Sequence, residues 1–171
     1  MKDKTIVLLL SHPDIFKSVA NKMLLEVANS IPEIEVINLY DKDFDVDSQI
    51  KAIDKATALI FQFPFYWASA PSQLKKWIDE VFTSIAKTEV VKNKPLLVVT
   101  TTASEYEAYR SGGRNKFTVD ELLRPYQMLA NHSGMIWQTP FVMYGMGTDE
   151  ALQNLKSGVD EYRKRIKSLL D

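Results

Sequence analysis

The 171-residue sequence contains no cysteine. This absence excludes a disulfide framework, a thiolate metal site and a cysteine nucleophile, and it fits the reducing cytoplasm, where we expect the protein to reside. The sequence also has no excess of charge of either sign, because 21 basic and 22 acidic residues give a net charge of −1. A balance so near zero argues against a basic nucleic-acid-binding face, and it differs from the strongly acidic balance of small electron carriers that dock electrostatically.

Long hydrophobic runs and the common nucleotide or metal motifs are absent as well. The first apolar run, Thr5–Leu10, is too short for a signal-peptide core or a membrane span. The sequence has no G-x-G-x-x-G, no G-x-x-x-x-G-K-[ST] and no H-E-x-x-H, so the usual dinucleotide, triphosphate and zinc sites lack their signatures. We therefore expect no metal site and no membrane span.

Short apolar runs alternate with amphipathic segments along the whole chain, which we interpret as a single domain over residues 1–171. Alternating strands and helices predict an α/β fold: a doubly wound five-stranded parallel sheet in the order 2-1-3-4-5, with helices on both faces. The predicted strands are Thr5–Leu10, Ile34–Asn38, Ala58–Phe63, Pro95–Thr100 and one within Met135–Met143 that Pro140 interrupts. The predicted helices are Ser18–Ser30, Ser48–Lys55, Pro71–Phe82, Thr118–His132 and one that Thr148 caps, with a polar connector of little signal at residues 84–93. Thr118 and Glu121 match a capping box, and Gly134 has the usual C′ position. The apolar face of the first helix is Val19, Met23, Leu24 and Val27, and the apolar stripe of the last is Leu152, Leu155, Val159, Tyr162, Ile166 and Leu169.

In this strand order the chain reverses direction between strands 1 and 3, which opens a crevice at the carboxyl ends of the strands. Three loops with unusual side chains should meet there: Ser11–Lys17, Pro64–Ala70 and Thr101–Asn115. The second loop carries Phe65, Tyr66 and Trp67, where a connector would ordinarily be polar. This aromatic loop is either a platform for a flat ligand or a subunit interface, and a site at a dimer seam would make it both.

Other residues near the predicted crevice have two interpretations each. Ser18 and Asn21 open the first helix, where free peptide N–H groups suit a phosphate, but Ser18 is equally expected as a plain N-cap. His12 directly follows the first strand, and a functional role is the favoured interpretation. Tyr109, close to Gly112 and Gly113, lies either in a surface loop or in a loop that brings a phenol to a ligand.

Three motifs stand out in this sequence: S-H-P…S-x-x-N at Ser11–Asn21, F-Q-F-P-x-Y-W-x-S-x-P-x-x-L-K-K-W at Phe61–Trp77, and S-E-x-E-x-Y-x-x-G-G-x-N ending at Asn115. Together they resemble the flavodoxin-like NAD(P)H:quinone oxidoreductase family, in particular its small bacterial branch of general stress protein 14 and ancillary quinone reductases of potassium efflux. The resemblance implies a flavin phosphate site at His12, Ser18, Val19, Ala20 and Asn21. It also implies isoalloxazine contacts at Pro64, Phe65, Tyr66 and Trp67, and at Thr102, Ala103, Ser104 and Glu105.

The same resemblance implies a homodimeric enzyme that binds FMN, with FAD as the alternative cofactor. Hydride would pass from NAD(P)H to the flavin and then to a quinone in a ping-pong reaction, with Tyr109 as the phenol that stabilises developing charge. A non-catalytic regulatory subunit of a membrane transporter and a one-electron carrier are the alternatives. Three features depart from the family. Ala103-Ser104 replaces a glycine corner, and Arg114, Asn115 and Lys116 stand where many members carry a histidine, so an acid role there falls to Tyr109 or is absent. Residues 83–94 form a shorter connector without aromatics or glycines, which predicts either a low flavin affinity or a more open site.

Overall fold

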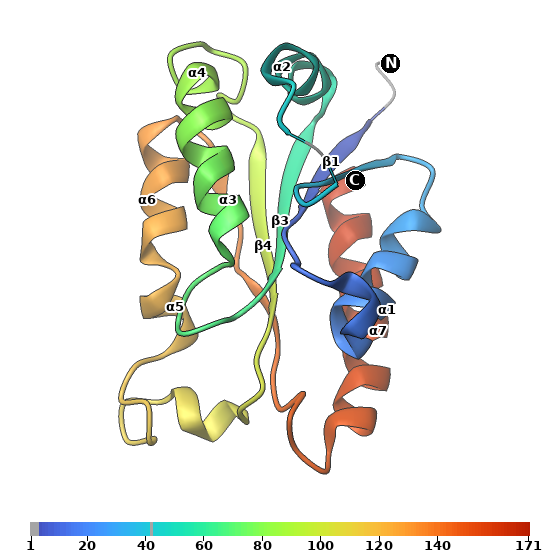
Figure 1. The fold of residues 1–171 in the computed structure, drawn as a ribbon, viewed down its shortest axis with the longest axis vertical. Helices are drawn as coiled ribbons and strands as arrows, with labels where there is room; N and C mark the ends of the chain where they lie inside the picture. The colour runs from blue at the N-terminus through green and yellow to red at the C-terminus, as the bar shows by residue number, and fades with distance from the viewer. Residues whose placement is uncertain (1–3, 42) are drawn as a thin grey trace.

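The computed structural model describes residues 4–41 and 43–171, which form a parallel sheet with helices on both faces (Figure 1). The strand order is β2-β1-β3-β4-β5, with β6 also paired to β4, so the predicted order is confirmed. The strands are β1 (Ile6–Leu10), β2 (Ile34–Asn38), β3 (Ala58–Pro64), β4 (Pro95–Thr101), β5 (Ile136–Trp137) and β6 (Phe141–Met143). The crevice expected beside β1 and β3 therefore has the topology that it requires.

The predicted fifth strand is two short strands on the same edge. β5 pairs with Pro95 and Leu96, whereas β6 pairs with the far end of β4, from Val99 to Thr101. Pro140 lies between them and has no N–H to donate to the ladder, which accounts for the break. The second piece still delivers the chain to the carboxyl edge of the sheet.

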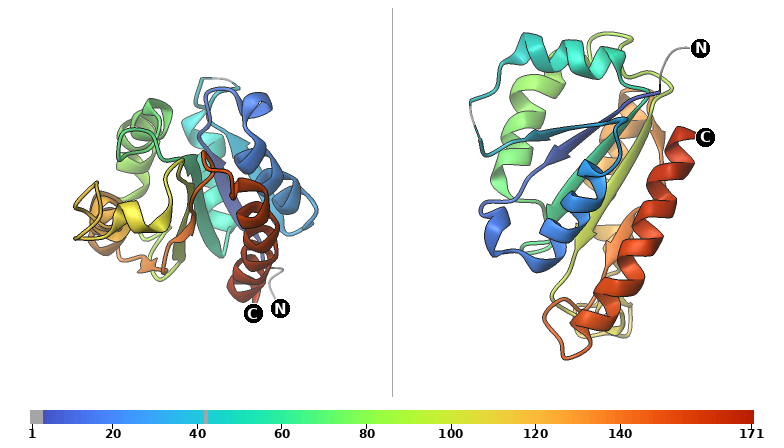
Figure 2. Two further views of the ribbon diagram at one scale, coloured as in Figure 1. Left: turned by 90° about the horizontal axis from the view of Figure 1, so that it is seen from below. Right: turned by 90° about the vertical axis from the view of Figure 1, so that its right-hand side faces the viewer.

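The helices form two layers, which Figure 2 shows on opposite sides of the sheet. α1 (Val19–Asn29) and α7 (Ala151–Leu170) cover one face. The other face is covered by α2 (Val46–Lys55), α3 (Ser72–Trp77), a π-helical turn η2 (Ile78–Phe82), α4 (Thr83–Ile85), α5 (Val119–Leu122) and α6 (Arg124–His132). The short helices η1 (Ile15–Lys17) and η3 (Tyr106–Tyr109) follow β1 and β4. None of the helices that these residues form combines the length and apolar character of a bilayer span.

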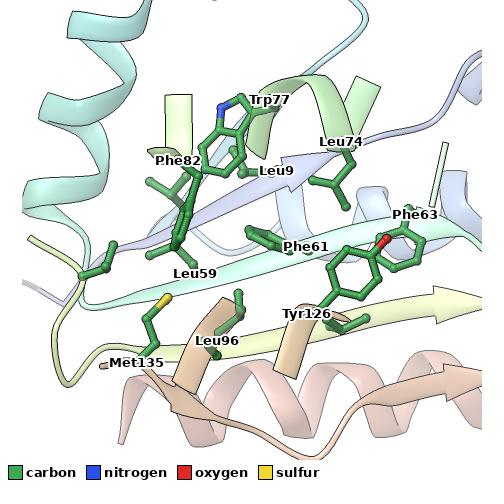
Figure 3. Close-up of a cluster of buried hydrophobic side chains, with 14 of the residues drawn as sticks. Leu9, Leu59, Phe61, Phe63, Leu74, Trp77, Phe82, Leu96, Tyr126 and Met135 are labelled. Carbon is green, nitrogen blue, oxygen red and sulfur yellow. The ribbon is translucent and has the colours of Figure 1, made fainter. Parts of the chain in front are cut away.

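Alternate residues of the central strands point into two separate hydrophobic cores, one on each face of the sheet. Leu9, Phe61 and Val98 point toward α3 and α6, where Trp77 and Tyr126 pack against them (Figure 3). Their neighbours Leu8 and Ile60 point toward α1 and α7. Strands buried on both faces read as continuous apolar runs, which is why the sequence located them well.

The sequence predicted some helix ends correctly and others incorrectly. Thr118 and Glu121 form the predicted capping box, and Gly134 has the predicted left-handed conformation, with φ of +72°. Thr148, however, does not cap the last helix: its hydroxyl donates to the Gly145 carbonyl and the helix begins at Ala151. The predicted helix at Ser48 begins at Val46 instead, because the side chain of Asp45 caps it.

Three further expectations are corrected by the packing. Val19 and Met23 lie on the exposed side of α1, whose buried side carries Ala20, Leu24, Val27 and Ala28. Leu152, expected in the buried stripe of the last helix, is 71% exposed because it lies beyond the sheet edge. The connector at residues 84–93, which showed little signal, holds the rest of α4 and buries Ile85 and Val91 in the core.

Candidate functional site

A cavity of about 630 Å³ opens at the carboxyl edge of the sheet, where the loops after β1, β3, β4 and β6 meet. The predicted site residues that line it are His12, Ser18, Val19, Ala20, Asn21, Pro64, Phe65, Tyr66, Thr102 and Ala103. Trp67, Ser104, Glu105 and Tyr109 do not line this cavity, although they lie on the same loops. The three predicted loops therefore meet at one cavity, and four of the predicted residues lie outside its wall.

The first turn of α1 forms one end of the cavity. Ser18 is its N-cap, and its Oγ accepts a hydrogen bond of 3.1 Å from the peptide N–H of Asn21. No acidic residue occupies the first turn of this 11-residue helix. Free peptide N–H groups and the positive end of the helix dipole make such a turn suited to an anion. Ser18 thus caps the helix as predicted, and its second role, in phosphate binding, stays a prediction.

The Asn21 side chain is buried, at 1% exposure, and only half of its amide is used. Its Nδ2 donates to Thr101 Oγ1 at 2.9 Å, whereas Oδ1 has no hydrogen-bond partner among the described residues. A buried carbonyl oxygen without a donor is unfavourable by about 1–3 kcal/mol. Because Asn21 lines the cavity, a ligand hydroxyl there would satisfy this oxygen.

His12 lies beside this turn with its tautomer set by the backbone. The peptide N–H of Asp14 donates to His12 Nδ1 at 3.1 Å, so the neutral ring carries its proton on Nε2. The His12 ring meets Tyr66 edge-on, with centroids 6.3 Å apart. Burial lowers the pKa of His12, and the nearby Asp14 carboxylate offsets part of that effect. His12 is therefore a neutral Nε2–H donor at neutral pH.

This lowered pKa predicts a pH dependence of stability. Because the unfolded histidine binds its proton more readily, with a pKa near 6.5, the free energy of unfolding should fall as the pH drops below that value. His12→Asn keeps an acceptor for the Asp14 N–H and removes the titration. Urea unfolding midpoints between pH 5 and 8 should fall less steeply in the variant. Equal slopes in both proteins would contradict this account of His12.

The aromatic loop after β3 is a tight two-residue turn. Tyr66 and Ser69 exchange peptide hydrogen bonds of 2.9 and 3.0 Å, and the residues between them, Trp67 and Ala68, have φ of +49° and +63°. Two consecutive positive φ values ordinarily favour asparagine and glycine, so this turn holds larger side chains in a disfavoured conformation. It leaves Trp67 fully exposed beside the cavity and Tyr66 half-exposed.

A loop that the sequence analysis missed fixes the corner after β4. The peptide N–H groups of Gly145, Met146 and Gly147 donate to the carbonyls of Ser104, Thr102 and Ala103 at 2.8–2.9 Å. A Cβ on Gly147 would lie 3.2 Å from both Ala103 Cβ and Ala103 O, so the glycine makes room for the alanine. The cavity wall contributed by this part of the chain is Met146, Gly147, Ala151, Leu152 and Leu155. The topology could have indicated this loop, because it follows the last strand and so lies at the same carboxyl edge as the other three loops.

Tyr109 lies next to the cavity in a second aromatic group. Its ring is 6.1 Å from Phe65 and 6.0 Å from Tyr144 between centroids. Burial raises the pKa of Tyr109, so the phenol stays protonated and able to donate at neutral pH. Arg114 ties this loop to the corner through Ser104 Oγ and through Glu105 at 3.5 Å.

Of the two glycines near Tyr109, only Gly113 is required by space. A Cβ there would lie 2.1 Å from the Glu107 carbonyl oxygen, whereas one on Gly112 would meet open space. At Gly113 the loop therefore packs directly against its own backbone at Glu107 and Ala108, and the role of Tyr109 stays a prediction.

Comparison with known proteins identifies the family of this chain. A family model described as flavodoxin-like fold matches residues 4–166, so the chain belongs to this flavodoxin-like family. General stress protein 14 of Bacillus subtilis is 36% identical over 82% of this chain and 85% of its own length. The uncharacterized NAD(P)H oxidoreductase YdeQ of Bacillus subtilis is 33% identical over 97% and 87%. The potassium-efflux ancillary protein KefG of Serratia proteamaculans is 33% identical over 81% and 80%.

Solved structures share the fold. General stress protein 14 of Treponema denticola in complex with FMN has a TM-score of 0.89 and 26% identity, over 96% of this chain and 99% of its own. An NADPH-quinone reductase of P. pentosaceus has a TM-score of 0.84 and 25% identity, over 94% and 96%. A structure described as a thermophilic tryptophan halogenase from Streptomycin violaceusniger has a TM-score of 0.87 and 32% identity, over 95% and 98%. Because these names differ in activity, the reaction has to be argued from the site.

Proposed function

We propose that this chain is an FMN-dependent NAD(P)H oxidoreductase that reduces quinones or similar flat electrophiles by two-electron, ping-pong hydride transfer. The observation that carries the proposal is a cavity with a helix N-terminus at one end and aromatic rings at the other, whose wall contains Asn21 with its buried, unpartnered Oδ1. Relatives named as NAD(P)H oxidoreductase and NADPH-quinone reductase support the reaction class. The FMN complex of general stress protein 14 supports FMN over FAD, the alternative cofactor.

The residues of the cavity fit the three parts of FMN. The first-turn N–H groups of α1, Ser18 and the Nε2–H of His12 would hold the phosphate. Asn21 Oδ1 would accept a hydrogen bond from a ribityl hydroxyl. The flat ring would lie against Pro64, Phe65 and Tyr66, with the corner from Thr102 to Glu105 at its polar edge.

When bound, FMN supplies the redox chemistry, accepting hydride from NAD(P)H and passing two electrons to the acceptor. The protein orients the reactants and excludes water at an apolar cavity wall. Tyr109, which burial keeps protonated, would donate a hydrogen bond to an oxygen on which negative charge develops. The carbonyls of Thr102, Ala103 and Ser104 are occupied by the Gly145–Gly147 loop and so do not repel that charge.

Tyr109→Phe tests this assignment. Removing the phenol donor should lower kcat with a quinone about tenfold and leave the Kd for FMN within about twofold of wild type, because Tyr109 lies outside the cavity wall. Steady-state kinetics and flavin-fluorescence titration measure the two quantities. Tyr106→Phe is a matched control, because its ring also packs on Tyr144 but is largely exposed. An unchanged kcat in Tyr109→Phe would remove Tyr109 from the reaction.

We also propose a cytoplasmic homodimer in which a second copy covers the exposed Trp67. The acceptor would then bind between the aromatic turn of one subunit and its partner. Sedimentation of wild type and Trp67→Ala tests this, with a smaller dimer fraction expected in the variant.

A second candidate function is that of an ancillary subunit of a membrane transporter, which the 33% identity to KefG supports. In that case the chain would co-purify with a potassium-efflux protein, and its flavin would turn over at background rate.

Initial-rate kinetics distinguish the two functions. In the presence of FMN, the NADPH concentration is varied at several fixed concentrations of a benzoquinone. The enzyme should then give parallel lines in double-reciprocal plots. Turnover at the rate of free FMN would contradict the oxidoreductase proposal.

A further inference from the structure

The central strand β3 contains one fully buried polar side chain, Gln62, in a run that is otherwise apolar. It belongs to the F-Q-F-P segment, yet it does not line the cavity and has no place in the reaction described above. An amide in the middle of a sheet is tolerated only where its hydrogen bonds are made. The partners of Gln62 therefore show what the side chain does.

Gln62 links the two helices that cover one face of the sheet, α1 and α7. Its Nε2 donates to the carbonyl of Asn21, in the first turn of α1, at 3.0 Å. Its Oε1 accepts from the hydroxyl of Tyr162, in α7, at 3.2 Å. Tyr162 is fully buried, and burial raises the pKa of its phenol, so the hydroxyl is a permanent donor. Because Tyr162 has its donor directed at Oε1, the amide of Gln62 is held with its N–H₂ toward α1.

Asn21 makes three hydrogen bonds, one to the N-cap of its own helix and two to neighbouring strands of the sheet. Ser18 holds its peptide N–H, Thr101 at the end of β4 holds its side-chain Nδ2, and Gln62 holds its carbonyl. The hydrogen bonds to Thr101 and Gln62 thus fix the position and orientation of the first turn of α1 relative to the edge of the sheet. Loss of one restraint would leave the turn able to shift, and the direction of its free N–H groups would change with it.

We propose that Gln62 and Tyr162 are positioning residues that orient the first turn of α1, so that its peptide N–H groups and Ser18 favour a phosphorylated flavin over an unphosphorylated one. The inference rests on the proposed FMN binding and extends it to selectivity for the phosphate. Neither residue touches the ligand. They act through Asn21.

The test compares the Kd values of FMN and riboflavin, by flavin-fluorescence titration, in wild type, Tyr162→Phe and Gln62→Leu. Ile166→Val is the matched control, because Ile166 is buried in the same core one turn further along α7. The ratio of the riboflavin Kd to the FMN Kd should fall about fivefold in Tyr162→Phe, and at least as much in Gln62→Leu, as expected for one lost hydrogen bond with a buried partner. It should stay at the wild-type value in Ile166→Val. A ratio that is unchanged in Tyr162→Phe, which keeps the shape of the side chain, would overturn the proposal.

A second readout needs no flavin. In the unliganded protein, exchange of the Asn21 amide hydrogen, which bonds to Ser18 Oγ, should be faster in Tyr162→Phe than in Ile166→Val. If wild type binds neither flavin, the proposed function fails and this exchange rate decides the positioning role by itself. Equal exchange in the two variants would then overturn it.

Discussion

Ser18→Asp should raise the Kd for FMN about a hundredfold and change the Kd for riboflavin by less than about twofold, because a carboxylate beside a phosphate in a partly buried site costs a few kcal/mol. Aspartate is also a good N-cap, so the helix should keep its first turn. The loss would therefore come from charge repulsion alone. Fluorescence titration with both flavins measures it.

Ser18→Asn is the matched control for this prediction. Asparagine has nearly the shape of aspartate and also caps helices, but it carries no charge. It should bind FMN within about threefold of wild type, since only the Ser18 hydroxyl is exchanged for another polar group. If Ser18→Asp and Ser18→Asn weaken FMN binding equally, or if riboflavin is affected as strongly as FMN, the phosphate does not bind at this turn.

Trp77→Ala should have the largest effect on stability, lowering the free energy of unfolding by about 3–5 kcal/mol. Trp77 is fully buried, and its ring packs on Phe61 and Phe82 with centroids 5.9 and 6.0 Å apart (Figure 3). Its indole N–H also donates to the buried Gln49, which would lose its partner. Urea unfolding followed by circular dichroism measures the change.

The same substitution at Trp67 provides the control. Trp67 is fully exposed, so Trp67→Ala should leave the unfolding free energy of the isolated subunit within about 0.5 kcal/mol of wild type. A dimer at the concentration used would add its own contribution, so both variants are compared across a dilution series. Similar losses in the two variants would contradict the packing described for Trp77.

The parts of the fold that follow local rules were predictable. Buried parallel strands appear as apolar runs, and the capping box at Thr118 and the left-handed Gly134 are set by neighbouring residues. The doubly wound order then placed the loops after β1, β3 and β4 at one edge. His12, Ser18 and Phe65 could be named from this topology and from the family resemblance together.

The remaining features depend on contacts between distant segments. Gln62 reads as one residue of an apolar run, and its partner Tyr162 is 100 positions away. The Gly145–Gly147 loop was missed because its hydrogen bonds go to residues 102–104 and leave no periodic pattern. Leu152 fits a buried helical stripe, but the sheet has ended at that level and the side chain borders the cavity instead. No periodicity distinguishes a core wall from a cavity wall.

The anaerobic absorption spectrum of the protein mixed with FMN tests the central claim most directly. Bound FMN should shift and sharpen the visible bands, lose them when NADPH is added, and regain them when a quinone follows, with each step complete at one equivalent. That sequence would demonstrate both half-reactions on this chain. A spectrum that stays identical to free FMN at every addition would contradict the account, because the cavity would then hold no flavin.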